Sequence, residues 1–203
     1  MKKILKRILV CGLVAAVCWS AVLLADRNQL NTGLIRFHVV ANSDSQQDQA
    51  IKLQVRDAVL NSMASDLQNI ANVDQAKEYL QANLPKIRLL VDQTLDHLGF
   101  AGESSVSLCK ETFDVRHYDT FSLPSGVYES LRIVIGEGLG RNWWCVSFPT
   151  LCMPATTTGF QDAAVSAGFS ESLSQTLCHN QKYEIRFFFL NQIGKLENIL
   201  FQE

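Results

Sequence analysis

The sequence predicts a single α+β domain, in which a mainly antiparallel sheet carries two helices on one face and an N-terminal hydrophobic helix comes first. Three observations support this fold class. Residues 8–25 are apolar and uncharged, two amphipathic helical patterns cover 46–67 and 73–98, and extended patterns occur before and after them. This order of elements does not alternate as a doubly wound fold would, and 203 residues suit one domain.

The N-terminus has the layout of an export signal. Four basic residues come first, and the 18 residues from Ile8 to Ala25 carry no charge. This pattern is typical of a secretory signal peptide or a membrane anchor, and a buried core helix would leave the basic flank unexplained. The run ends in Leu-Leu-Ala, which places a large residue where cleavage prefers a small one and favours an uncleaved anchor.

These features divide the chain into three parts. Residues 1–25 are predicted to be a signal peptide or N-terminal membrane anchor, residues 26–33 a polar spacer, and residues 34–203 an extracytoplasmic domain. The domain is expected outside the cytoplasmic membrane, either secreted into an intermembrane space or anchored to the outer face by residues 8–25.

The first half of the domain has clear local signals. Residues 34–41 alternate as a strand, and Ser45 with Asp48 has the spacing of a helix cap for the helix over 46–67. Asn72 is placed to cap the second helix, in which Pro85 predicts a kink or restart.

The second half is predicted mainly as strands. Residues 132–135 and 143–148 are expected to form a hairpin around the glycine-rich loop over 136–142. Residues 155–176 have weak periodicity and are expected to form a mobile loop. Residues 182–190 are predicted to be a last strand, followed by a closing helix over 192–201.

Charge and motifs exclude several functions. Without the four N-terminal basic residues the chain has 14 basic and 20 acidic residues, a net charge of −6, which disfavours nucleic-acid binding. The glycine-rich loop lacks a following helix that would bind phosphate, and no nucleophile motif or metal-ligand spacing is present. The sequence therefore indicates a protein that is not an enzyme and has no cofactor or metal.

Four cysteines lie in the predicted domain, which allows three pairings. Cys145 and Cys152 are close in sequence, so a local disulfide between them is one interpretation. The other interpretation is that the cysteines are small buried residues.

Two groups of residues are candidates for partner binding. His38 lies on the polar side of the first strand, with Asn42 and Asp44 just beyond its end. Trp143 and Trp144 are consecutive on a strand, so they face opposite ways, and Arg141 lies beside them. The alternatives are that Asn42 and Asp44 shape a turn around a core histidine, and that both faces of the sheet are covered.

Several sequence blocks together resemble the stage II sporulation protein R family. The quoted blocks are LIRFHVVANSDS at 34–45, DQAIKL at 48–53, VRDAV at 55–59, LPSGVYESLRIVIGEG at 123–138 and NWWCVSFPTLC at 142–152. The resemblance covers most of residues 34–152 and is weaker beyond Cys152.

The resemblance implies an exported sporulation signal that activates a membrane-embedded aspartic protease in the mother cell. That protease would then process a sigma-factor precursor, and the present chain would contribute no catalytic group. The resemblance itself does not identify the binding residues, and our own hypothesis places the receptor contact on an edge formed by His38, Asn42, Asp44 and Arg132, together with the surface of Trp143. A cell-envelope binding module or a cell-wall hydrolase is the alternative function. A hydrolase would bring His38 and Asp44 together with another acid in a cleft.

Overall fold

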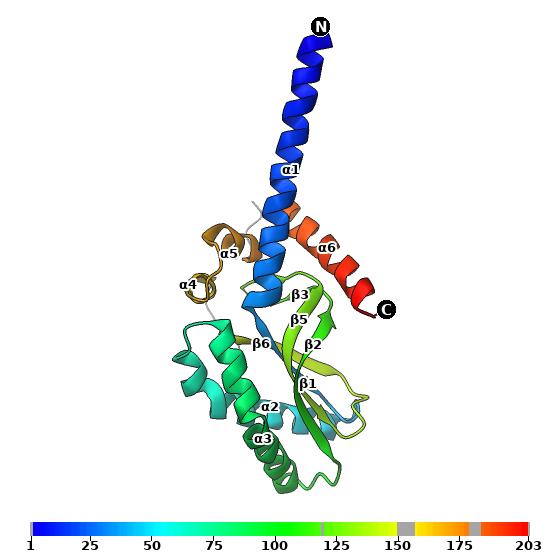
Figure 1. Ribbon diagram of the computed structural model, residues 1–203. Coiled ribbons are helices and arrows are strands. Elements are labelled where there is room, and N and C mark those ends of the chain that lie inside the picture. The colour runs from blue at the N-terminus through cyan, green and yellow to red at the C-terminus, as the bar shows by residue number, and fades with distance from the viewer. Residues whose placement is uncertain (1, 119, 150–156, 179–183, 203) are drawn as a thin grey trace.

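A computed structural model describes residues 2–118, 120–149, 157–178 and 184–202 (Figure 1). Its helices are α1 (Lys2–Gly33), α2 (Gln46–Gln68), α3 (Val73–His97), α4 (Thr157–Ser166), α5 (Glu171–Leu177) and α6 (Glu184–Gln202). Its strands are β1 (Ile35–Val40), β2 (Ser104–Phe113), β3 (Arg116–His117), β4 (Ser122–Leu123), β5 (Gly126–Ile135) and β6 (Asn142–Phe148). The predicted α+β class, with an apolar N-terminal helix, is confirmed.

The central sheet has four strands in the order β2-β5-β1-β6. β1 pairs antiparallel with β6 and parallel with β5, whereas β2 and β5 are antiparallel. The sheet is therefore mixed, with two of these three pairings antiparallel. A separate two-stranded sheet joins β3 and β4.

Helices α2 and α3 follow the caps that the sequence indicates. The Ser45 hydroxyl accepts the backbone N–H of Asp48, and the Asn72 side chain accepts that of Gln75. Pro85 lies inside a single continuous α3, so the predicted restart is wrong; the Asn83 amide instead donates to the carbonyl of Tyr79. A proline in a helix interior removes one hydrogen bond, and the apolar face of α3 remains packed across this point.

The sheet has a different neighbour on each face. Ile35, Phe37 and Val39 of β1 pack with the apolar faces of α2 and α3 in one core cluster. Phe113 and Tyr128, on the opposite face, pack in a second cluster with residues of α1, α4, α5 and α6. Figure 1 shows the α2–α3 pair at the lower part of the sheet and the other helices grouped around the inner end of α1. The second cluster covers part of the other face of the sheet, in line with the alternative that both faces are covered.

The glycine-rich loop between β5 and β6 is not a hairpin, which corrects the sequence prediction. β1 lies between these two strands, so the loop crosses the end of β1. Along the way, the N–H groups of Leu139 and Gly140 donate to the carbonyls of Asn42 and Ala41. A Cβ at Gly140 would lie 2.2 Å from the carbonyl oxygen of Ser43, so this close crossing requires a glycine.

Residues 26–33 are not a free spacer. They continue α1 without a break, and Asp26, Arg27 and Leu30 are buried against the domain. The N-terminal part of α1 is exposed and projects away from the rest of the chain (Figure 1). Length and composition make α1 the one helix among the described residues that could cross a membrane, a test that a signal sequence also passes.

The C-terminal third differs from the sequence prediction. The expected loop over 155–176 contains helices α4 and α5, and mobility of this segment stays a prediction. The expected strand over 182–190 is wrong from residue 184 onward, because α6 covers this stretch; residues 182 and 183 lie outside the described residues. Consecutive phenylalanines suggested a strand apolar on both faces, but in α6 Phe187 packs on the second cluster while Phe188 and Phe189 are exposed.

Candidate functional site

The central strands place a group of polar and aromatic side chains on the face opposite α2 and α3. In the sheet register, His38 of β1 lies beside Arg132 of β5 on one side and Trp144 of β6 on the other. Glu111 reaches the same place from the edge strand β2. We call His38, Glu111, Arg132, Trp144 and the nearby Arg116 the His38 cluster.

The geometry of the His38 cluster is compact. The rings of His38 and Trp144 are stacked, with 3.8 Å between centroids and 16° between planes. His38 Nδ1 lies 3.2 Å from one carboxylate oxygen of Glu111, and Arg132 Nε lies 3.2 Å from the other. The guanidinium of Arg116 lies over the Trp144 ring, 4.6 Å from its centroid. Each aromatic or acidic member therefore contacts a basic one.

Burial and charge set the ionisation of Glu111. Burial alone raises the pKa of this carboxyl, but the hydrogen bond with His38 and the nearby charges outweigh it, so the pKa lies below its ordinary value. Glu111 is consequently a carboxylate at neutral pH, and its two oxygens lie next to His38 Nδ1 and Arg132 Nε.

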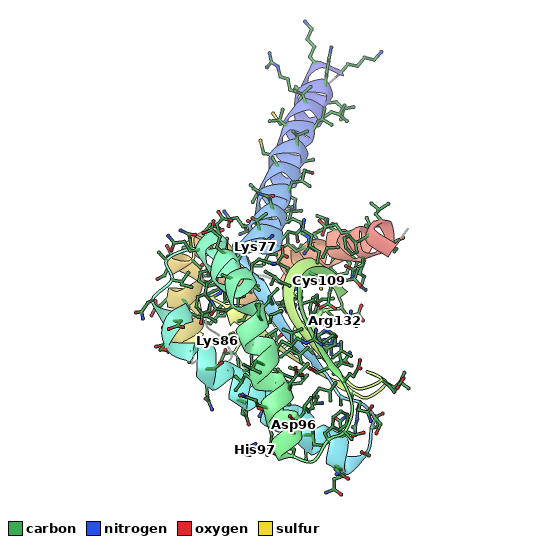
Figure 2. All side chains as sticks on the ribbon, turned by 60° about the horizontal axis from the view of Figure 1, so that its bottom comes forward. Lys77, Lys86, Asp96, His97, Cys109 and Arg132 are labelled. Carbon is green, nitrogen blue, oxygen red and sulfur yellow. The ribbon has the colours of Figure 1, made fainter. Side chains whose placement is uncertain are left out.

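Exposure differs sharply within the cluster. The whole residue His38 is only 5% exposed, and its Nε2 has no hydrogen-bond partner among the described residues. The Arg132 side chain is 43% exposed, and Arg116 and Trp144 are half-buried. Figure 2 labels Arg132 and Cys109 on the neighbouring strands β5 and β2, and the register places their side chains on the sheet face opposite the α3 helix that carries Lys77, Lys86, Asp96 and His97. A partner would therefore meet the arginines and Trp144, whereas His38 supports them from below.

A second arginine lies deeper on the same face. Arg36 is fully buried, with its guanidinium over the rings of Phe113 and Tyr128 and one nitrogen donating to the Tyr118 hydroxyl. Burial lowers the pKa of Arg36, and the interactions with Tyr118 and Tyr128 oppose this shift. Arg36 thus forms part of the floor beneath the His38 cluster and not of its accessible surface.

Asn42 and Asp44 are separate from this cluster. The Asn42 side chain accepts the N–H of Glu137 and donates to Asp48, and Asp44 accepts the N–H of Arg141. Arg141 also forms an exposed ion pair with Asp44, 3.4 Å long. These contacts hold the crossing loop against the end of β1. They agree with the alternative that Asn42 and Asp44 shape a turn.

The two tryptophans lie on opposite faces of the sheet, as their neighbouring positions predict. Trp143 packs edge-on against Phe37, and the guanidinium of Arg56 lies 4.8 Å from its centroid. Trp143 therefore belongs to the helix-covered face. The proposed binding residues split into the His38 cluster, the Asn42–Asp44 loop contact and Trp143.

The predicted disulfide between Cys145 and Cys152 can be followed at Cys145 alone. Cys145 is disulfide-bonded, but Cys152 lies outside the described residues, so the pairing of these two stays a prediction. Cys109 is a free thiol on the same sheet face as Glu111. Burial raises the pKa of the Cys109 thiol, although a contact with Ser107 acts in the opposite direction. A raised pKa disfavours the reactive thiolate.

Glu111 and Arg116 are the members that sequence reasoning missed. Glu111 is 73 residues from His38 in the chain, and only the pairing of β2 with β5 brings the two side chains together. The available signal was alternation: Ser105, Ser107, Cys109 and Glu111 occupy every second position of a strand, so they share one face.

The cluster is suited to recognition. Arginine and tryptophan are enriched among residues that dominate protein interfaces, and here both are held by stacking and ion pairing. Among the described residues there is no group of three His, Cys, Asp or Glu side chains that could hold a metal ion. His38 and Asp44 do not converge, because Glu111 contacts the first and Arg141 the second.

Comparison with known proteins gives two matches. The family model described as stage II sporulation protein R matches residues 31–158, more than half of the chain. A Bacillus subtilis (strain 168) protein named stage II sporulation protein R is 37% identical over 118 residues, which are 58% of this chain and 53% of that protein. The chain thus spans about half the length of this curated relative. No solved structure matches at a significant level.

Proposed function

The chain belongs to the stage II sporulation protein R family, and we propose that it is a sporulation signalling protein acting outside the cytoplasmic membrane. Its receptor is a membrane-embedded aspartic protease of the mother cell. Activation of that protease triggers processing of a sigma-factor precursor. The chain itself contributes binding energy and no catalytic group.

The observation that carries this proposal is the position of the family match. It covers residues 31–158, which contain all four strands of the central sheet and the whole His38 cluster. An apolar helix of the kind found in signal peptides and membrane anchors leads directly into this region. An export segment joined to a built recognition surface supports a signal that is delivered across a membrane.

The proposed mechanism is differential binding. A ligand shifts an equilibrium only by its difference in affinity for the two states, so the chain must bind the active state of the protease more tightly. Arg132, Arg116 and Trp144 are the accessible side chains of the His38 cluster, and they form the proposed contact. Arg141 and Asp44, which pair where the loop between β5 and β6 crosses the end of β1, form a second and more exposed part of the proposed contact.

A hydrolase is less well supported by the geometry. The cleft expected for it would unite His38 and Asp44 with another acid, and these two side chains have different partners. An envelope binding module remains an alternative, and it is distinguished by deleting the protease: a binding module would retain its phenotype, whereas a signal would lose it.

Reconstitution tests the proposal. The full chain is produced in cells that carry the protease and its sigma-factor precursor, and precursor cleavage is measured. Cleavage is expected only when both proteins are present, and a protease with its active-site aspartate replaced provides the control. Cleavage that is unchanged without the chain would refute the proposed function.

A further inference from the structure

Helix α6 carries a stripe of large apolar side chains that the described part of the protein leaves exposed. The stripe recurs with helical spacing and consists of Ile185, Phe188, Phe189, Leu196, Ile199 and Leu200, all of which are exposed. Gln192 lies within it. A soluble surface rarely exposes this many large apolar side chains on one helix face.

The opposite side of α6 is firmly docked. Leu190 is fully buried in the second core cluster. Arg186 pairs with Asp26 and Glu197 with Arg27, which ties both halves of α6 to α1. A Cβ at Gly194 would lie 1.6 Å from the carbonyl oxygen of Ser125, so the helix also sits directly on the start of β5. The orientation of the stripe is therefore fixed by the packing behind it.

The position of α6 relative to α1 identifies what would cover the stripe. The uncharged residues Ile8–Ala25 span about 27 Å as a helix, which is close to the hydrocarbon thickness of a bilayer. Asp26 follows immediately, so its partner Arg186 lies at the level where α1 leaves the hydrocarbon. The first turn of α6 is thus at the headgroup region.

We propose that α6 is a second membrane contact, whose apolar stripe lies in the interface of the same bilayer that α1 enters. Figures 1 and 2 both show α6 leaving the side of α1 where α1 joins the domain. Spanning helices tilt by about 20° on average, so α1 need not stand upright for α6 to reach the interface. This inference rests on the proposed placement of α1 in a membrane and is independent of the protease.

Charge indicates which lipid surface suits α6. Arg186 and Glu197 are engaged by α1, which leaves Lys195 as the exposed cation in the described part of the helix after residue 184. Interfacial helices that depend on anionic lipid carry many Lys or Arg residues on the polar face. Apolar burial therefore drives this contact, and zwitterionic and anionic bilayers should accept α6 equally.

Tryptophan fluorescence of the full chain in vesicles tests the inference. Leu196→Trp places a reporter in the stripe, in a Trp19→Phe background that removes the tryptophan of α1. Trp143 and Trp144 remain in every variant, so the emission of the background protein is subtracted. Leu139→Trp is the matched control, because Leu139 is 80% exposed and lies at the end of the sheet farthest from α1. The vesicles contain spin-labelled phosphatidylcholine, with and without phosphatidylglycerol. Phe188→Trp is a second stripe reporter in case one substitution disturbs folding.

The expected result is a blue-shifted emission at position 196 and a loss of that emission on adding the spin-labelled lipid, in both lipid mixtures. Position 139 should show neither change. The inference would be overturned if quenching at positions 196 and 188 were no greater than at position 139. It would also be overturned by a blue shift that occurs without lipid quenching and disappears when the protein is diluted in lipid, because such a shift indicates contact with a second copy of the chain. The unaltered chain and the Trp19→Phe background share Trp143 and Trp144, so the difference between their emissions reports insertion of α1. Failure of α1 placement is thereby distinguished from failure of the α6 contact.

Discussion

Asp26 and Arg186 form an ion pair 2.5 Å long, although 160 residues separate them. Both side chains are largely buried, at 5% and 12% exposure. The pair joins the point where α1 enters the domain to the first turns of α6. The folded domain therefore begins inside the N-terminal helix.

Removal of this ion pair should destabilise the domain. Asp26→Asn leaves the buried Arg186 without its carboxylate, which typically costs about 3 kcal/mol. Chemical denaturation of the full chain in detergent micelles measures the loss. Arg88→Ala breaks an exposed pair with Asp92 and should cost less than about 1 kcal/mol. Similar small losses for both variants would mean that α1 is not held by Asp26.

The crossing of the glycine-rich loop over β1 should be sensitive to one added methyl group. Gly140→Ala brings its Cβ against backbone atoms of Ser43, which cannot move away cheaply, so we expect a loss of about 1–3 kcal/mol. Gly102→Ala is the control, since its Cβ meets only the flexible ring of Phe100. The urea midpoint of each variant gives the comparison. An unaffected Gly140→Ala variant would contradict the close crossing.

Acid should weaken the fold partly through Glu111. The pKa of Glu111 is depressed in the folded chain, so its stabilising contribution is fully present above the ordinary value of 4.5 and is lost as the pH falls through the lower folded value. The free energy of unfolding of Glu111→Gln should accordingly fall less between pH 5 and about pH 3 than that of the unaltered chain. Glu103→Gln, at an exposed carboxylate, is the control and should follow the unaltered chain. Parallel pH profiles for all three proteins would exclude this role of Glu111.

The exposed arginine of the His38 cluster should matter for signalling more than for folding. Arg132→Ala leaves the contact between His38 and Glu111 in place, so only a modest change in stability is expected. Loss of an interface arginine typically costs about 2 kcal/mol, close to thirtyfold in affinity. Precursor cleavage as a function of the amount of chain measures the effect, with Arg88→Ala as the charge-matched control on α3. Full signalling by a folded Arg132→Ala variant would show that Arg132 is not part of the receptor contact.

Much of the fold was predictable because its signals are local. Ser45 and Asn72 cap their helices with backbone N–H groups only three residues away, and the alternation of residues 34–41 depends on neighbours in a single strand. The apolar run over 8–25 is likewise visible from composition alone. Each of these features forms for reasons contained within a few turns of chain.

The candidate site was predictable only in part. His38, Arg132 and Trp144 were identified, but their common partner Glu111 was not, and Asn42 and Asp44 proved to fasten a loop. The stripe of α6 was hidden because three consecutive phenylalanines fit a buried strand as well as a helix with one packed side.

The sequence by itself therefore determined the α+β class, the two capped helices, the first strand and the apolar N-terminal helix. Only the tertiary structure decided that β1 separates β5 from β6, that Glu111 meets His38, and that α1 and α6 are joined through Asp26 and Arg186. The physical reason is the distance along the chain over which each feature is decided. Caps and alternation depend on adjacent residues, whereas strand order and buried ion pairs depend on which distant segments are buried against each other.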